Sequence, residues 1–327
     1  NFVHFLHNKY PDYKIVVLDS LTYAGNLKNL PQQALDNRQI EFVYGSILNV
    51  GLVDKIVEKS DYIVHFAAET HVTRSIYDNS TFFQTDVLGT QAIANAVLKY
   101  AERVERFIHI STSEVYGTAL DEKMDEDHPL NPMSPYASAK CGADRLVYSY
   151  YQTYQIPVTI IRPFNQFGPR QHLEKVIPRF ISSCLLNDKI TVHGDGSASR
   201  DWTYVDDTCR GIDLILHADE KDVVGEVFNL GNDEAISVKE IAEIICGKMN
   251  FNAENIVYIS DRPGQVVRHT CNYEKLKNRL GWSPSVSFDN ALNQTIDWYK
   301  NNKDLWEVQL WLREIEIENS KGLKQLH

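Results

Sequence analysis

Short apolar runs alternate with stretches of helical spacing along the first half of this chain. Five runs rich in β-branched residues have the length and composition of buried strands, at 14–19, 41–44, 62–68, 107–110 and 157–162. Strands that alternate with helices in this way predict a doubly wound, mostly parallel α/β sheet. Since such sheets bind ligands at the carboxyl ends of their strands, the polar residues after each run are the first candidates for function.

The alternation changes after Gly168-Pro169, where short strands, helices and turns follow one another irregularly. These pieces predict a smaller α+β lobe that closes over the first domain. We therefore expect a first domain over 1–168 and a mainly substrate-binding lobe over 169–303, with some of its segments returning to the first domain. Residues 304–327 have the pattern of an acidic, then lysine-bearing tail that is helical through Arg313.

The start of the chain resembles the middle of a βαβ unit. Residues 1–10 have the pattern of the end of an amphipathic helix, and the strand that follows closes on Asp19. An acid at the end of a second strand usually binds an adenosine ribose, but the first strand and glycine-rich turn that should precede this helix are not in the sequence. We expect either that this start was lost or left out, or that Asp19 is only a turn residue at a strand end.

Charge and composition restrict the class of partner. Hydrophobic residues make up 43% of the chain and charged residues 24%, which is ordinary for a soluble globular protein. The net charge of -11 argues against nonspecific nucleic-acid binding, which needs clustered Lys and Arg. It is compatible with one anionic small molecule held by a few local cations.

Cysteine usage and hydropathy favour a soluble cytoplasmic protein with no membrane segment. The chain has no apolar run long enough to span a bilayer and no signal peptide. The cysteines are odd in number and show no metal-ligand spacing, so reduced thiols and no metal site are expected. They are Cys141, Cys184, Cys209, Cys246 and Cys271.

The strongest candidate site begins where the run 107–110 ends. Three hydroxyls and a carboxylate follow it directly, as Ser111, Thr112, Ser113 and Glu114. These side chains lie where an open α/β sheet places its ligands.

A helix that carries a tyrosine and a lysine follows about twenty residues later. Ser134-Pro135 predicts its start, with a hydroxyl N-cap and a proline at the first helical position. Tyr136 and Lys140 are then i and i+4, so they share one helix face. A lysine ammonium beside a phenol lowers the phenol pKa, which makes Tyr136 a usable base or acid near neutrality. The alternative is a surface Tyr and Lys on an ordinary helix, but the polar strand end at 111–114 favours the functional interpretation.

With these segments in place, nearly the whole chain resembles the extended short-chain dehydrogenases/reductases. It is most similar to the nucleotide-sugar 4,6-dehydratases typified by dTDP-glucose 4,6-dehydratase. The resemblance implies a Rossmann-type fold in which 1–168 binds NAD, and it suggests a homodimer formed by helices around 81–100 and 135–153. The shared stretches lie at 18–27, 66–72, 111–117, 174–178, 200–202 and 261–264.

The resemblance also implies a reaction, in which bound NAD is reduced and reoxidised within one turnover. Tyr136 removes the proton of the sugar C4 hydroxyl while Thr112 holds that oxygen and Lys140 also binds the nicotinamide ribose. Glu114 removes the hydrogen at C5, which the 4-ketone has made acidic. Water leaves from C6 and the hydride returns there, so the product is a 4-keto-6-deoxy sugar nucleotide.

Binding residues are carried over position by position from the same resemblance. The catalytic set is Thr112, Ser113, Glu114, Tyr136 and Lys140. The residues expected to hold NAD are Asp19, Ser46, Ile47, Ala67, Ala68, Glu69, Ser111, Tyr136 and Lys140. The residues expected to contact the sugar nucleotide are Thr112, Asn165, Glu174, Lys175, Arg200, Asn232 and Arg262.

Departures from the family pattern leave the substrate open between dTDP-glucose and a UDP-hexose such as UDP-N-acetylglucosamine. Ser113 stands where dTDP-glucose dehydratases usually have the aspartate that protonates the departing C6 oxygen. Either Glu114 serves both steps, or a water or a neighbouring group acts, or the substrate differs. Thr73 and Gln265 also replace expected residues near the sugar and the nucleotide; Ser46 and Asp86 do so near NAD. The alternatives are a UDP-N-acetylglucosamine 4,6-dehydratase that epimerises C5, a UDP-glucuronate decarboxylase, a 4-epimerase, and an inactive NAD-binding scaffold.

Overall fold

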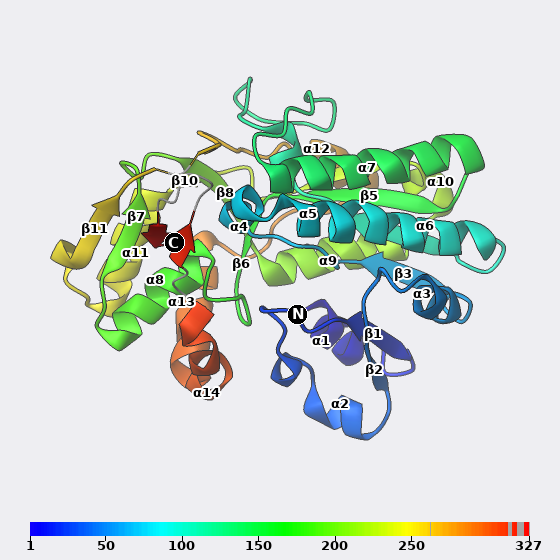
Figure 1. The fold of residues 1–327 in the computed structure, drawn as a ribbon, viewed down its shortest axis with the longest axis horizontal. Coiled ribbons are helices and arrows are strands. Elements are labelled where there is room, and N and C mark those ends of the chain that lie inside the picture. The colour runs from blue at the N-terminus through cyan, green and yellow to red at the C-terminus, as the bar shows by residue number, and fades with distance from the viewer. Residues whose placement is uncertain (262, 313–315, 319–323, 327) are drawn as a thin grey trace.

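A four-stranded parallel sheet forms the centre of the molecule (Figure 1). The computed structural model describes all residues except 262, 313–315, 319–323 and 327. The sheet has the order β3-β4-β5-β9, and all neighbours are parallel. Its strands are β3 (Tyr62–His65), β4 (Arg106–Ile110), β5 (Val158–Pro163) and β9 (Val227–Leu230). A second parallel pair is formed by β1 (Ile15–Asp19) and β2 (Ile40–Tyr44).

Helices cover both faces of the central sheet because its strands are apolar on both sides. Adjacent residues of β4 show this: Phe107 packs with residues of α6 (Thr90–Lys99) and α7 (Pro135–Tyr154). Its neighbour Ile108 packs on the opposite face, with residues of α1 (Phe2–Lys9) and α9 (Val205–Leu216). This alternation is the period-two geometry of a strand buried between two helical layers, so the predicted doubly wound parallel architecture is confirmed.

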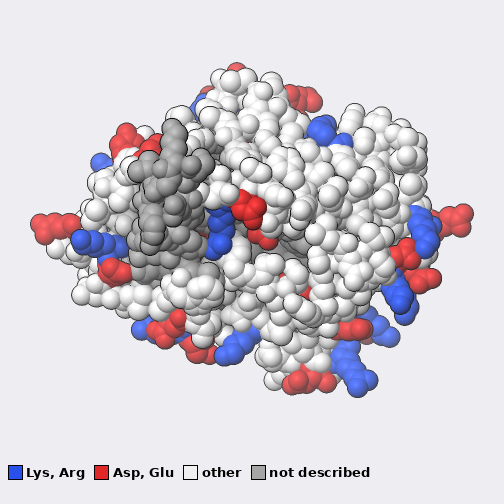
Figure 2. Space-filling view, in the orientation of Figure 1, with Lys and Arg blue, Asp and Glu red and all other residues white. Residues whose placement is uncertain are grey.

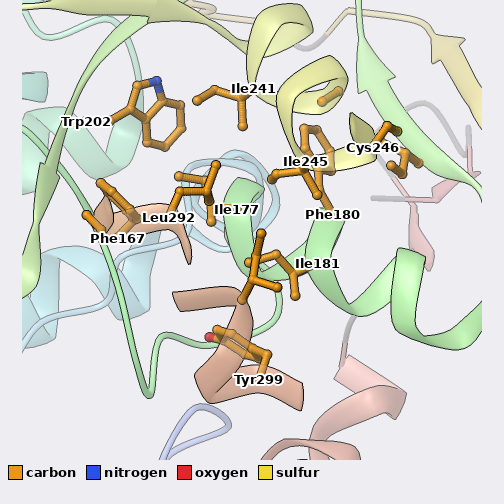
Figure 3. Packing of buried hydrophobic residues seen from close by; sticks show 14 of the residues in the cluster. Phe167, Ile177, Phe180, Ile181, Trp202, Ile241, Ile245, Cys246, Leu292 and Tyr299 are labelled. Atoms are coloured by element: carbon orange, nitrogen blue, oxygen red, sulfur yellow. The ribbon is translucent and has the colours of Figure 1, made fainter. Parts of the chain in front are cut away.

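The second lobe is built around its own apolar core. Trp202, Phe180, Ile241, Ile245 and Tyr299 interdigitate there (Figure 3). They come from one strand and three helices of a lobe that contains two small sheets, with the orders β10-β8-β6 and β11-β7. The strands of these sheets and the three helices are β6 (Asn165–Phe167), β7 (Ile190–His193), β8 (Ser199–Tyr204), β10 (Ala235–Ser237), β11 (Ile256–Ile259), α8 (Val176–Leu186), α11 (Val238–Met249) and α13 (Phe288–Asn301).

Shorter elements connect these layers. The remaining α-helices are α2 (Gln32–Asp36), α3 (Val50–Val57), α4 (Val72–Tyr77), α5 (Asn79–Phe82), α10 (Glu220–Val223), α12 (Glu274–Leu280) and α14 (Lys303–Trp306). The 3-10 segments are η1 (Leu27–Asn29), η3 (Ser113–Tyr116), η4 (Ala253–Asn255) and η5 (Glu307–Leu312).

The helical spacing at 81–100 corresponds to three segments rather than one helix. Between α5 and α6 the chain forms a π-helical segment, η2 (Phe83–Gly89). Gly89 ends it in direct contact with Ile47, where a Cβ atom would collide with the isoleucine side chain. The wider π turn also carries Asp86 into the interior, and such turns are frequent at functional sites.

The tail differs in part from its prediction. Helical structure continues through α14 and η5 as far as Leu312, and Arg313 lies outside the described residues. Two short antiparallel strands follow, β12 (Glu316–Glu318) and β13 (Lys324–Leu326), and the sequence analysis did not predict them.

Candidate active site

The end of β4 turns directly into the 3-10 segment η3, as its polar composition requires. Thr112 is the N-cap, and its Oγ1 accepts a hydrogen bond of 3.2 Å from the backbone N–H of Glu114. Thr112 and Ser113 are buried, whereas the Glu114 side chain is 18% exposed. The capped turn therefore presents one carboxylate at the strand end with two hydroxyls beneath it.

The predicted start of α7 is confirmed. Ser134 caps the helix with its Oγ, which accepts a hydrogen bond of 3.1 Å from the backbone N–H of Ala137, and Pro135 occupies the first turn. This start places Tyr136 at the first turn of α7, where its side chain hydrogen-bonds with Thr112 and experiences the charge of Glu114. The structure thus brings Tyr136 to Thr112 and Glu114, which lie more than twenty positions earlier in the sequence.

The predicted acidity of Tyr136 is wrong. Burial raises the pKa of Tyr136 well above its usual value, and the hydrogen bond with Thr112 offsets this only in part. The charge of Glu114 raises the pKa further. Lys140 was expected to lower it, but its Nζ is directed at the backbone and donates a hydrogen bond of 2.7 Å to the Ile110 carbonyl oxygen.

Lys140 interacts electrostatically with two buried carboxylates, neither of which the sequence analysis placed in the catalytic set. Burial lowers the pKa of Lys140, and the charges of Asp86 and Asp144 oppose that shift. Asp86 is itself buried, and desolvation raises its pKa to about 7 although Lys140 counteracts it. Its Oδ1 accepts a hydrogen bond of 2.8 Å from the backbone N–H of Glu69. The sequence analysis named Asp86 only as a departure from the family pattern. Its burial accompanies the π-helical segment η2, which the sequence analysis did not predict.

A histidine that sequence reasoning missed lies against the catalytic turn. The Nδ1 of His269 is 3.3 Å from Ser113 Oγ and 3.9 Å from Glu114 Oε1. Its Nε2 is 2.7 Å from the Gly117 carbonyl oxygen. His269 is separated from Ser113 by 156 positions, and no local pattern around it indicates chemistry. Only the tertiary fold brings it to the site.

Apart from Tyr136 and Lys140 on α7, the expected NAD-binding residues lie at or just after the ends of parallel strands. Asp19 ends β1, and its Oδ1 accepts a hydrogen bond of 2.6 Å from the backbone N–H of Leu21. After β2, Ser46 Oγ accepts a 3.1 Å hydrogen bond from the Leu48 N–H, and Ile47 is buried. Ala67, Ala68 and Glu69 follow β3, and Ser111 follows β4.

These residues fit a dinucleotide. An exposed carboxylate at Asp19 suits ribose hydroxyls, and the small side chains of Ala67 and Ala68 allow a ligand to approach the backbone. The buried pair Tyr136 and Lys140 supplies polar groups at the opposite end of the set, after β4.

Glu174 is the centre of a polar cluster that joins the lobe to the first domain. Its carboxylate accepts a 3.1 Å hydrogen bond from the Tyr23 hydroxyl and lies 3.2 Å from Lys175 Nζ. Burial disfavours its charge, but Lys175, His71 and His172 together hold the pKa of Glu174 below its usual value. Arg74 lies 3.8 Å above the Tyr23 ring as a cation–π contact. The cluster contains two expected substrate residues, and its other members were not predicted.

The remaining expected substrate residues lie around β8. Arg200 is buried on β8, and Asn165 begins β6 beside it in the same sheet. The neighbouring Asp201 accepts backbone hydrogen bonds from Asn232, Asp233 and Cys271, so it fixes the loop that carries Asn232. Desolvation raises the pKa of Asp201 to about 6 in spite of these bonds. Arg262 lies outside the described residues.

Comparison with known proteins agrees with this geometry. The family model for GDP-mannose 4,6 dehydratase matches residues 1–295. The chain belongs to this family. The chain is 42% identical to the low-salt glycan biosynthesis protein Agl12 of Haloferax volcanii, over 91% of the chain and 94% of that protein. It is 38% identical to a dTDP-glucose 4,6-dehydratase of Actinoplanes sp., over 90% of the chain and 91% of that protein.

A solved structure shows the same fold. The dTDP-glucose 4,6-dehydratase DesIV of Streptomyces venezuelae, a double mutant with NAD and DAU bound, superposes with a TM-score of 0.89 at 37% identity, covering 94% of this chain and 95% of that chain. The predicted Rossmann-type fold and membership of the extended short-chain dehydrogenases/reductases are confirmed. The predicted class of reaction, NAD-dependent nucleotide-sugar 4,6-dehydration, and the predicted cofactor are confirmed with them. Within the described part of the chain, every helix is too short or too polar to cross a bilayer.

Proposed function

We propose that the protein converts dTDP-glucose, or a UDP-hexose such as UDP-N-acetylglucosamine, to the 4-keto-6-deoxy sugar nucleotide, and that Thr112, Glu114 and Tyr136 do the proton chemistry. The observation that carries this proposal is their meeting at the carboxyl end of β4, with Tyr136 hydrogen-bonded to Thr112 and facing the charge of Glu114. A carboxylate and a phenol at one strand end can serve two different carbon centres of a single hexose.

Tyr136 and Thr112 act at C4. When bound, NAD takes the C4 hydride, later returns it to C6, and brings a positive ring that favours the phenolate of Tyr136. Tyr136 removes the C4 hydroxyl proton, and the Thr112 hydroxyl holds the same oxygen. Lys140, fixed to the Ile110 carbonyl, binds the nicotinamide ribose.

Glu114 acts at C5. Its carboxylate is the more exposed part of the catalytic turn, and its backbone N–H is fixed by Thr112. It is therefore accessible to a substrate and held in a defined orientation. Once C4 is a ketone, a carboxylate of ordinary basicity can remove the C5 proton, which lies alpha to the carbonyl.

The lobe binds the sugar nucleotide. In this proposal 1–168 is the NAD-binding domain and 169–303 the substrate lobe. Buried Arg200 is suited to the diphosphate, because a guanidinium binds phosphate through paired donors. Asn165, Glu174, Lys175, Asn232 and Arg262 complete the expected substrate contacts, and Asp19, Ser46, Ile47, Ala67, Ala68, Glu69 and Ser111 the NAD contacts.

A homodimer in a reducing, cytoplasmic compartment belongs to the same proposal. The face over α5, α6 and α7 is largely free of charged side chains, which gather at the rim of the view (Figure 2). Phe83, Leu88, Met133 and Tyr148 are exposed on or beside these helices. A two-fold pairing of this face would bury them. The five cysteines are free, which suits reduced thiols.

Product analysis tests the proposal. The protein is incubated with NAD and, in parallel, dTDP-glucose, UDP-glucose, UDP-N-acetylglucosamine, UDP-glucuronate and GDP-mannose, and products are identified by mass. Dehydration gives a product lighter by one water, decarboxylation by one carbon dioxide, and epimerisation leaves the mass unchanged. Loss of water from one substrate, abolished in Tyr136→Phe, is the expected result. Carbon dioxide loss, or no reaction with any substrate, would contradict the proposal.

A further inference from the structure

The proton donor for the departing C6 oxygen is not evident from the catalytic turn alone. Ser113 occupies the position where the family resemblance expects an aspartic acid, and a serine hydroxyl is a far weaker acid. Its Oγ is buried, and it faces the ring of His269 at 3.3 Å. The residue that contacts this hydroxyl, His269, is therefore the first candidate for the source of the proton that the C6 oxygen needs.

The position of His269 is fixed by the backbone on both sides. Its N–H donates a hydrogen bond of 3.1 Å to the Ser199 carbonyl oxygen, and its own carbonyl accepts one of 3.0 Å from the Asp201 N–H. The segment thus pairs with β8, the strand that carries Arg200. The side chain is fully buried and packs edge-on against Phe164.

The contacts of the ring define its tautomer. A carbonyl oxygen only accepts, so Nε2, 2.7 Å from the Gly117 oxygen, carries the ring proton. Nδ1 is then the acceptor, and it faces Ser113 Oγ and Glu114 Oε1 together. Gly117 has a φ of 72°, and a side chain there would collide with the backbone of Asn131, so the backbone that presents this carbonyl requires glycine.

Burial keeps the ring neutral between reactions. Burial lowers the pKa of His269 to about 4, the charge of Glu114 opposes this, and Arg200 lowers it again. The hydrogen bond to the Gly117 carbonyl raises the pKa, and the charge of His128 lowers it. Near neutral pH the ring can accept a proton at Nδ1 and release it again, because it has no proton there at rest.

We propose that Ser113 and His269 form a proton relay that carries the proton taken by Glu114 to the departing C6 oxygen. This inference rests on the proposed function. Ser113 is the group that faces the leaving oxygen, and His269 is a positioning residue that acts through it.

The step balances without any outside acid. Glu114 takes the C5 proton, and the C–H electron pair forms the enolate. Protonated Glu114 passes its proton to Nδ1 of His269, which passes it to Ser113 Oγ while Ser113 gives its own hydroxyl proton to the C6 oxygen. The C6–O bond breaks with its electron pair on oxygen, which leaves as water. All three side chains then have their starting charges.

His269→Gln tests the relay, because glutamine can still donate to the Gly117 carbonyl but has no acceptor at the Nδ1 position. In deuterated water, C5 exchange should continue and the recovered substrate should gain deuterium, while product formation slows about 10²-fold or more. Ser113→Ala should likewise retain C5 exchange and slow product formation. The double variant should form product no more slowly than either single variant. Ser113→Asp in the His269→Gln background should restore water loss, because the carboxylic acid supplies the proton itself.

The control is His128→Asn. His128 is a second buried histidine, which contacts the backbone of Leu120 and Pro129, and its replacement should change neither C5 exchange nor the rate of product formation. Parallel loss of exchange and product formation in His269→Gln, with no rescue by Ser113→Asp, would overturn the relay and leave His269 a structural support of Glu114. Unchanged product formation would overturn it as well. Wild-type protein that loses no water from any sugar nucleotide would instead refute the proposed function itself.

Discussion

Two buried aspartates whose charges act on Lys140 differ in how completely their hydrogen bonds are satisfied. Asp144, on the helix itself, accepts hydrogen bonds of 2.9 and 3.0 Å from the guanidinium of Arg162. Asp86, on the π turn, accepts one from the Glu69 N–H, and its Oδ2 has no hydrogen-bond partner. Burial disfavours both charges, but Arg162 brings the pKa of Asp144 below its usual range, whereas that of Asp86 rises to about 7.

The difference between the two aspartates corresponds to their places along α7, from the candidate site at its start to the core further on. Tyr136, Lys140 and Asp144 are spaced by four residues and share one face of α7. The first two lie at the catalytic turn, beside the under-satisfied Asp86, and the third closes a complete ion pair that also involves the Tyr116 hydroxyl at 3.0 Å from Arg162. One helix face therefore serves chemistry at its start and stability eight residues later. Substitutions at the two ends should separate activity from stability.

The largest effect is expected at the catalytic end. Tyr136→Phe removes the proposed base for the C4 hydroxyl but keeps the ring that packs against Phe82. Turnover should fall by about 10²- to 10⁴-fold, while the free energy of unfolding changes by less than about 1 kcal/mol. Steady-state rates and denaturant unfolding measure the two quantities. A comparable loss of stability would break the proposed separation.

The core end should show the reverse. Asp144→Asn leaves the buried Arg162 charge without its counter-ion, and the free energy of unfolding should fall by about 3–5 kcal/mol. Arg145, which is 40% exposed and bonds to the same carboxylate, provides the control: Arg145→Met should cost less than about 1 kcal/mol. Equal losses of unfolding free energy in the two variants, measured in urea, would show that the buried pair contributes no more to stability than the exposed one.

Asp86→Asn should stabilise the protein in a pH-dependent way. The folded-state pKa of Asp86 is about 7, above that of an unfolded aspartate, so the folded state binds the extra proton and stability falls as the pH rises from about 4 to 7. Asparagine has no such charge and can still accept the Glu69 N–H. The variant should gain on the order of 2 kcal/mol at about pH 8 and little at about pH 4. A gain in stability that does not depend on pH would show that the charge of Asp86 is not what destabilises the wild-type protein.

The smallest effect concerns the start of α7, which positions the catalytic end. Ser134→Ala removes the cap on the Ala137 N–H and should lower the free energy of unfolding by about 1 kcal/mol. Ser134→Asp, which retains an acceptor, should lose less. If the alanine variant were as stable as the wild type, the cap would not be what fixes Tyr136.

Local patterns were sufficient for the elements that carry the catalytic residues. Strand β4 and the capped start of α7 follow from apolar runs, a serine N-cap and a proline, and they place Thr112, Glu114 and Tyr136 correctly. The acidity of Tyr136 was not accessible, because it depends on burial and on the direction of Lys140. His269, the Asp144–Arg162 pair and the burial of Asp86 were missed for the same reason: each depends on contacts between segments separated in sequence. Neither 3.6-residue nor two-residue periodicity contains that information.

Solvent deuterium at sugar C5 tests the central claim most directly. In deuterated water the wild-type protein should give a product that has lost one water and carries deuterium at C5. Glu114→Gln should block this exchange while the nicotinamide is still reduced by oxidation at C4. Undiminished C5 exchange in Glu114→Gln would contradict the assignment of Glu114 as the base and, with it, the account of how this strand end works.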